Sequence, residues 1–225
     1  MCGRVAQYQG AREYADTFSE WPFLNFVGSE PLQQYNLPPS KPLATFWRDE
    51  EALGARLVRW GWQPHWATDN RHPSNARSEK VAHSSYWRAI WPHRALCPVN
   101  GWFEWVTEGG PKKQPYFIRR QDGQPTLCAA IGQFAHDAHT ELPGEGVVII
   151  TADSLGGMVD IHDRRPVALS PEMAREWLDP LTPKERAEQI ILQQAEPADA
   201  FEWFRVSPDV GNSRNNGENL ICPWT

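Results

Sequence analysis

Short apolar segments separated by proline and glycine turns run through most of this sequence and constrain its fold. The 225 residues include 20 prolines and 16 glycines, which interrupt long helices. Strands are predicted at 4–7, 43–48, 55–60, 95–99, 101–106, 115–120, 126–134, 146–151, 161–169 with a break at Pro166, and 200–206. The pattern predicts an α+β fold: a single domain, 1–225, with a curved, mainly antiparallel β-sheet, a barrel-like core and flanking short helices.

Helix signals are fewer. Ser170 followed by Pro171 predicts a helix over 172–178, and Thr182 followed by Pro183 predicts another that runs to about 194. Apolar spacing also favours a short helix at 11–19 and a partly helical segment at 81–91. The paired prolines in 35–40 indicate a loop.

Composition limits the function classes. The net charge of −6 argues against a general polyanion binder, although it leaves room for a local basic groove. There is no apolar run long enough to span a membrane and no signal-peptide pattern, so a cytoplasmic protein is expected. The four cysteines form no metal-ligand spacing, and we expect no metal, no cofactor and no disulfide framework.

The second residue carries unusual chemistry. Removal of Met1 would leave Cys2 with an α-amine and a thiol on adjacent carbons. The amine has an expected pKa of about 7.7 to 8.0, so a fraction is neutral and nucleophilic at pH 7. An aldehyde could form a Schiff base with this amine, and the thiol could then close a thiazolidine ring intramolecularly. The alternative interpretation is that Cys2 is a small residue in a first strand.

Motifs along nearly the whole chain resemble the SRAP family, the SOS-response-associated peptidase domain. They are Met1-Cys2-Gly3-Arg4, Tyr35-Asn36 with Pro39, Trp60-Gly61, Asn75-Ala76-Arg77-Ser78-Glu79, Gly101-Trp102-Phe103-Glu104-Trp105, Ile131-Gly132, Thr151-Ala152, His162-Asp163-Arg164-Arg165-Pro166, and Val206-Ser207 before Val210-Gly211-Asn212. The resemblance implies covalent crosslinking to abasic sites in single-stranded DNA.

The resemblance also implies catalytic roles for Cys2, Asn75, Glu104 and His162. A carboxyl group flanked by aromatic residues, as in Glu104, exchanges protons near neutral pH, and an imidazole such as that of His162 suits proton transfer as the sugar opens. Asn75 offers an amide to position the opened sugar or the amine. Read from local sequence alone, the three would be a solvent-facing strand residue, a structural histidine and a turn residue.

Five further residues are predicted to bind DNA. Arg4, Arg77 and Arg164 provide forked donors for phosphates. Trp66 is predicted to stack on a base and Pro39 to wedge beside the lesion. Two positions depart from the family pattern, since Ala67 follows Trp66 where a second tryptophan is expected and Ser85 stands where arginine is expected.

The predicted function is that of an abasic-site processing protein that shields the lesion in single-stranded DNA. We expect a monomer that binds no membrane and associates with the nucleoid when bound to DNA, with lyase and autopeptidase activities as further possibilities. Three alternatives remain open: an amidotransferase with an N-terminal nucleophilic cysteine, a thiol peptidase, and a noncovalent module that binds single-stranded DNA. Crosslinking that depends on Cys2 would distinguish the predicted abasic-site processing function from the noncovalent binding module.

Overall fold

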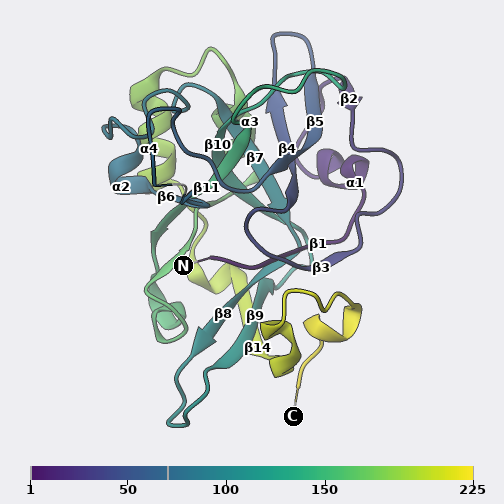
Figure 1. The fold of residues 1–225 in the computed structure, drawn as a ribbon, viewed down its shortest axis with the longest axis vertical. Helices are drawn as coiled ribbons and strands as arrows, with labels where there is room; N and C mark the ends of the chain where they lie inside the picture. Colours follow the sequence, from purple (N-terminus) through teal and green to yellow (C-terminus); the bar gives the residue numbers. More distant parts are fainter. Residues whose placement is uncertain (1, 70, 225) are drawn as a thin grey trace.

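Two β-sheets dominate the computed structural model, which describes residues 2–69 and 71–224 (Figure 1). The smaller sheet has five strands, and its strand β1 crosses the middle of the molecule while β8, β9 and β14 extend away from the larger sheet. In spatial order these strands are β14 (Phe201–Arg205), β9 (Gln114–Arg120), β8 (Gly101–Val106), β1 (Val5–Gln7) and β3 (Gln34–Leu37).

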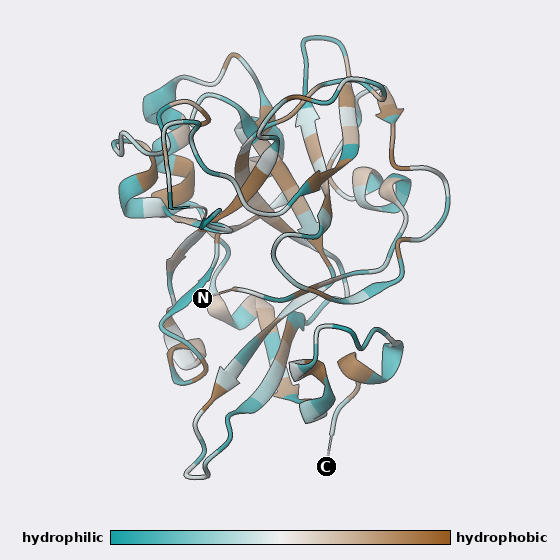
Figure 2. Cartoon of the chain, in the orientation of Figure 1, coloured by the Kyte–Doolittle hydropathy of each residue, from teal (hydrophilic) through white to brown (hydrophobic). Residues whose placement is uncertain are grey.

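The larger sheet contains most of the apolar strands, whose hydrophobic residues are brown in Figure 2. Its main path is β12 (Arg164–Pro166), β11 (Gly146–Asp153), β10 (Thr126–Gln133), β7 (Arg94–Val99), β4 (Pro42–Arg48), β5 (Leu53–Arg59) and β2 (Phe23–Asn25). Strand β13 (Ala168–Leu169) pairs with β10, and β6 (Asn75–Arg77) pairs with β11. Only the β2–β5 and β6–β11 pairs among the named strands are parallel.

Short helices pack around these sheets. They are α1 (Ala11–Asp16), α2 (Ser78–Val81), α3 (Pro171–Leu178) and α4 (Lys184–Gln193), with 3-10 turns η1 (Gly156–Asp160), η2 (Ala198–Ala200), η3 (Pro208–Gly211) and η4 (Glu218–Ile221). Ser170 caps α3 by accepting a hydrogen bond from the Met173 backbone N–H. Within the described residues, the helices are too short and too polar to cross a membrane.

The predicted α+β class is confirmed, and the two sheets remain open rather than closing into a barrel. Three local predictions were wrong. The 35–40 segment begins as strand β3, because Tyr35 to Leu37 pair with β1 before the prolines start. Segment 81–91 consists mainly of turns after the four-residue helix α2. Helix α4 has no side-chain cap, since the Thr182 hydroxyl donates instead to the Glu176 carbonyl at 2.6 Å.

One buried glutamine joins the two sheets. The Gln7 amide nitrogen donates to the carbonyls of Ala44 at 3.1 Å and Pro98 at 2.7 Å, and its carbonyl oxygen accepts from the Ala44 N–H at 2.8 Å. Gln7 lies on β1 of the smaller sheet, whereas Ala44 and Pro98 lie on β4 and β7 of the larger sheet. The side chain therefore replaces the backbone partners that two crossing sheets cannot give each other.

We predict that Gln7→Ala lowers the free energy of unfolding by about 2 to 4 kcal/mol, because buried backbone groups of Ala44 and Pro98 lose their partners. Urea denaturation followed by circular dichroism measures this change. Gln34→Ala, which truncates an exposed glutamine on the neighbouring β3, is the matched control and should change stability by less than about 0.5 kcal/mol. Equal effects of the two changes would contradict the bridging role.

Candidate functional site

Pairing between β1 and β8 brings the start of the chain to Glu104. Val5 lies opposite Trp102 in this antiparallel pair, and the Phe103 N–H donates to the Arg4 carbonyl at 3.0 Å. Because antiparallel partners run in opposite directions, residues before Val5 meet residues after Trp102. Cys2 is fully buried at this position. Met1 lies outside the described residues, so its removal stays a prediction.

Asn75 ties this N-terminal segment to the larger sheet. It starts β6, and its amide nitrogen donates to the Cys2 carbonyl at 2.7 Å and to the Ser74 hydroxyl at 3.2 Å. The Asn75 carbonyl oxygen is buried and accepts no hydrogen bond from the described residues. The side chain thus fixes the backbone of Cys2 and keeps one acceptor available for a donor group on a ligand.

Glu104 and His162 form the titratable part of the site. The Glu104 carboxyl lies 3.7 Å from His162 Nε2 across the space between β8 and the segment before β12. Glu104 is only 3% exposed, and this burial raises its pKa to about 7, with the negative charge of Asp163 as a smaller cause in the same direction. Burial also lowers the pKa of half-buried His162 below its usual value. Near neutral pH, therefore, the carboxyl exchanges its proton readily and the imidazole is mainly neutral.

The Cys2 thiol is held in its protonated form. Its burial, and secondly the nearby charge of Glu104, raise the pKa of this thiol well above its usual range. A thiolate is consequently scarce before a ligand arrives. The structure thus places all four predicted catalytic residues in one connected group, with Asn75 bonded to Cys2 and Glu104 close to both Cys2 and His162.

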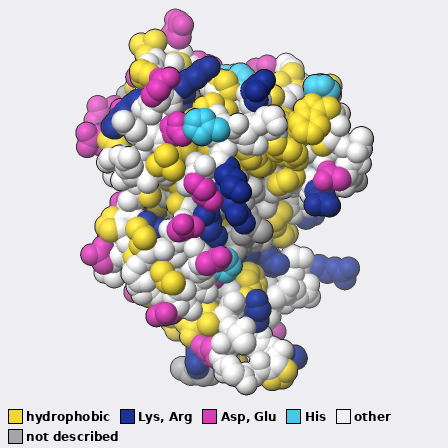
Figure 3. Space-filling view, turned by 90° about the vertical axis from the view of Figure 1, so that its left-hand side faces the viewer, with side chains coloured by type: hydrophobic (Ala, Val, Ile, Leu, Met, Phe, Trp, Pro, Cys, Tyr) yellow, Lys and Arg dark blue, Asp and Glu magenta, His cyan; other side chains and the backbone are white. Residues whose placement is uncertain are grey.

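The predicted DNA contacts differ in their accessibility. Arg4 is half-buried, donates to the side-chain oxygen Oδ1 of Asn36 at 2.7 Å and to the backbone carbonyl of Val210 at 2.8 Å, and lies over the Trp105 ring. Arg77 is exposed at the end of β6, two residues from Asn75. Figure 3 shows the face that lies at the left in Figure 1, where basic side chains gather near the middle between acidic ones.

The two predicted nonpolar contacts lie on turns. Trp66 is 56% exposed, and its ring meets that of Tyr86 edge to face with the ring centroids 5.8 Å apart. Pro39 is half-buried in the turn between β3 and β4. The contacts of both residues with DNA stay predictions.

Arg164 occupies a place that favours a structural role over the predicted phosphate contact. Its side chain is 8% exposed and is paired with Glu79 at 3.0 Å and Asp153 at 2.5 Å. It also donates to the Thr151 carbonyl at 2.6 Å. These partners join α2, β11 and β12, so the guanidinium is already committed within the protein.

Two residues without a predicted role lie at the site. Asn36 donates through its amide nitrogen to the carbonyls of Val210, Asn212 and Asn215 at 2.9 to 3.1 Å. The sequence signalled Asn36 only as part of a family motif, since its acceptors lie more than 170 residues away. Asp163 contacts His162 Nδ1 at 2.7 Å, and its adjacency in the sequence was the available signal.

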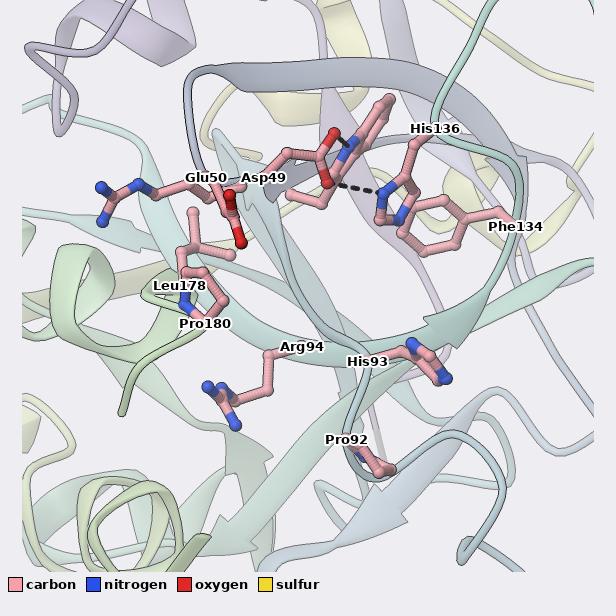
Figure 4. A pocket seen from close by; sticks show the side chains of 11 residues that line it. Asp49, Glu50, Pro92, His93, Arg94, Phe134, His136, Leu178 and Pro180 are labelled. Atoms are coloured by element: carbon pink, nitrogen blue, oxygen red, sulfur yellow. Dashed lines mark hydrogen bonds and ion pairs between the residues drawn. The ribbon is translucent and has the colours of Figure 1, made fainter. Parts of the chain in front are cut away.

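Other features give no support for a metal or a second catalytic centre. Among residues 2–69 and 71–224, no group of three or more histidine, cysteine or acidic side chains is placed to hold a metal. A pocket of about 290 Å³ lies between the β4–β5 turn and the end of α3 (Figure 4). It contains the ion pair of His136 with Asp49 at 2.7 Å but none of the predicted catalytic residues.

The raised pKa of Glu104 predicts a pH-dependent effect on stability. An unfolded glutamate has a pKa of about 4.3, whereas burial raises the folded value to about 7. Stabilisation from the protonated group is therefore complete below about pH 4 and is lost as pH rises through 7. Glu104→Gln should raise the free energy of unfolding at pH 8 by up to about 3 kcal/mol relative to the parent protein, with little difference at pH 4.

Urea denaturation at the two pH values measures this difference. Glu50→Gln, which neutralises an exposed carboxylate at the β4–β5 turn, provides the baseline for loss of one negative charge. A Glu104→Gln effect that is independent of pH would contradict the assigned shift.

Comparisons with known proteins identify the family of this chain. The family model described as SOS response associated peptidase (SRAP) matches residues 1–213. The abasic site processing protein YedK of Escherichia coli is 42% identical over 225 residues, which cover 99% of this chain and 100% of that protein. The abasic site processing protein HMCES of Rattus norvegicus is 30% identical over 201 residues, covering 74% of this chain and 56% of the rat protein.

A solved structure supports the fold. A phage-related protein of Bordetella bronchiseptica is 34% identical and superposes with a TM-score of 0.73, covering 91% of this chain and 94% of the other. The family model spans nearly all of the sequence and includes each of the four residues grouped at the site. The chain therefore belongs to the SOS response associated peptidase (SRAP) family.

Proposed function

We propose that this chain processes abasic sites by binding single-stranded DNA and crosslinking covalently to the lesion through Cys2, after removal of Met1. Its relatives are named abasic site processing proteins, which supports the general activity. The observation that carries the covalent mechanism is the grouping of Cys2 with Asn75, Glu104 and His162 around one buried carboxyl group.

The chemistry balances without a cofactor. The α-amine of Cys2 attacks the aldehyde carbon of the opened sugar and forms a carbinolamine. Loss of water then gives a Schiff base, to which the thiol adds across the C=N bond. The thiol proton ends on the nitrogen, so a five-membered thiazolidine ring forms with one water released overall.

The electrostatics favour attack by the amine before the thiol. Burial holds the Cys2 thiol in its neutral form, whereas a terminal amine has a pKa of about 7.7 to 8.0 and is partly neutral at pH 7. Once the Schiff base exists, the thiol is held in the same residue, three bonds from the imine nitrogen, and closing the five-membered ring needs no second encounter. The amine therefore selects the aldehyde and the thiol stabilises the product.

Glu104 and His162 move the protons that this sequence requires. A carboxyl group with a pKa of about 7 accepts a proton from the amine and later returns one at the same pH. The acceptor oxygen of Asn75 lies beside the Cys2 backbone and positions a hydroxyl of the opened sugar. The same acid–base pair supports reversal of the crosslink, strand cleavage at the lesion and autopeptidase cleavage after Met1.

DNA is held by contacts outside this buried group. Arg77 and Arg4 bind phosphates, Trp66 stacks on a base, and Pro39 wedges beside the lesion. An abasic nucleotide in a single strand is already unstacked, so little energy is needed to bring it to Cys2. We place a monomer with this activity in the cytoplasm, at the nucleoid when it is bound to DNA. The crosslink shields the lesion during repair.

Cys2 variants test the covalent mechanism. The parent protein, incubated with an oligonucleotide carrying one abasic site, should give an adduct that survives denaturing electrophoresis and has the summed mass less one water. Cys2→Ala should give no stable adduct, whereas borohydride should still trap its Schiff base because the α-amine remains. An equally stable adduct from Cys2→Ala without borohydride would contradict thiazolidine formation, and an intact Met1 in the adduct would contradict attack by the Cys2 amine.

Salt dependence tests the predicted phosphate contact of Arg77. We expect Arg77→Ala to weaken binding to intact single-stranded DNA and to reduce the slope of log affinity against log salt by about 0.7, the value for one phosphate on a single strand. Fluorescence anisotropy at several salt concentrations measures the slope. Arg71→Ala, which removes an exposed arginine paired with Asp69, is the matched control, and an equal change in both variants would overturn the assignment.

A further inference from the structure

One nitrogen of His162 has two competing partners. An oxygen of the Asp163 carboxylate lies 2.7 Å from His162 Nδ1, and the backbone N–H of Arg164 is directed at the same nitrogen at 2.9 Å. The other ring nitrogen, Nε2, lies on the side of Glu104 at 3.7 Å. The ring therefore connects a surface carboxylate to the buried carboxyl group.

These two contacts require opposite states of the ring. A neutral imidazole carries its proton on one nitrogen, and the other nitrogen accepts hydrogen bonds. Contact with the Asp163 carboxylate requires a proton on Nδ1, whereas contact with the Arg164 N–H requires a lone pair there. The Arg164 N–H contact is a hydrogen bond to the lone pair of Nδ1, whereas the Asp163 contact is a close charge contact that favours a proton there. In the neutral ring only one of the two is favourable at a time, and the choice fixes whether Nε2 is an acceptor or a donor toward Glu104.

We propose that Asp163 is a positioning residue that keeps the proton of His162 on Nδ1 and so leaves Nε2 as the base of the site. The assignment of the tautomer concerns the free protein, and its catalytic consequence rests on the function proposed above. In that reaction Glu104 accepts the proton that frees the amine for attack, and Nε2 then takes a proton from the attacking nitrogen. The imidazolium that forms lies between the carboxyl groups of Asp163 and Glu104, and it returns the proton to the hydroxyl that leaves as water.

The surroundings of Arg164 explain why the alternative partner is always present. The ion pairs of its guanidinium with Glu79 and Asp153 hold this residue at the start of β12, and its backbone N–H is thereby held toward the imidazole. When the Asp163 carboxylate is removed, Arg164 becomes the partner of Nδ1. The proton of the ring then moves to Nε2 and points at Glu104. Nε2 has no lone pair in this state, so it cannot accept a proton from an amine.

The charges that face His162 come from several elements. Burial is the main cause that lowers its pKa, and the positive charges of the amino terminus and of Lys113, on the β8–β9 turn, act in the same direction. The negative charge of Asp163 acts against them. Glu104 approaches from β8. Removing the Asp163 carboxylate therefore shifts the titration of His162 to lower pH, in addition to exchanging the tautomer.

The first experiment reads the tautomer in the free protein. Two-bond nitrogen–proton correlation spectra of ring-labelled histidine, recorded at pH 8, should show the parent His162 with its proton on Nδ1. Asp163→Ala should place it on Nε2 and should lower the pKa of His162. Asp160→Ala, which removes an exposed carboxylate at the end of η1, two residues before His162, is the matched control and should keep the Nδ1 proton. A parent ring protonated on Nε2, or a variant that retains the Nδ1 proton, would overturn the proposal.

The second experiment reads the consequence for crosslinking. Asp163→Ala should form the adduct about tenfold more slowly at pH 7, with an altered pH profile and unchanged affinity for intact single-stranded DNA. Asp163→Glu should recover part of the rate, and Asp160→Ala should match the parent protein. An exchanged tautomer with an unchanged rate would refute the role of Asp163 in catalysis. If the parent protein forms no adduct, the proposed function fails, while the tautomer assignment is still judged by the spectra.

Discussion

Burying the Glu104 carboxyl group removes most of the water that would stabilise its ionised form, so ionising this group costs free energy. The protonation states of the neighbouring site residues depend on the same burial. The same burial moves the pKa of Glu104 into the range where a carboxyl group both accepts and donates protons at neutral pH. His162 and Cys2 share this water-poor environment, which keeps the imidazole mainly neutral and the thiol protonated. A set of neutral groups suits a reaction that starts from a neutral amine and an aldehyde.

The two sheets together position the catalytic candidates, each sheet contributing different residues. Strand β8 of the smaller sheet carries Glu104 and pairs with the N-terminal strand, while Asn75 at the edge of the larger sheet holds the Cys2 backbone. Gln7 then fixes β1 against the larger sheet through three hydrogen bonds. The alignment of the site consequently depends on the contact between the sheets and not on one loop.

Sequence reasoning succeeded where local signals decide the structure. The hairpin of β4 and β5, the apolar strand β11 and the Ser170 cap of α3 follow from alternation, apolar runs and capping chemistry. It failed where distant pairing decides. Strand β6 has three residues and exists through its parallel pairing with β11, and the ion pairs of the buried Arg164 side chain depend on Glu79 and Asp153, which lie in other elements. An arginine predicted from a motif to bind phosphate therefore lies inside the protein.

The C-terminal turns are linked to the start of the chain by Asn36. This amide binds three carbonyls of the segment from Val210 to Asn215, and Arg4 binds both Asn36 and the Val210 carbonyl. The segment thus helps to fix the side chain of Arg4, two residues from Cys2. Changes in the C-terminal turns, including deletions or fusions made for purification, would be transmitted to the position of that arginine without altering any residue of the catalytic group.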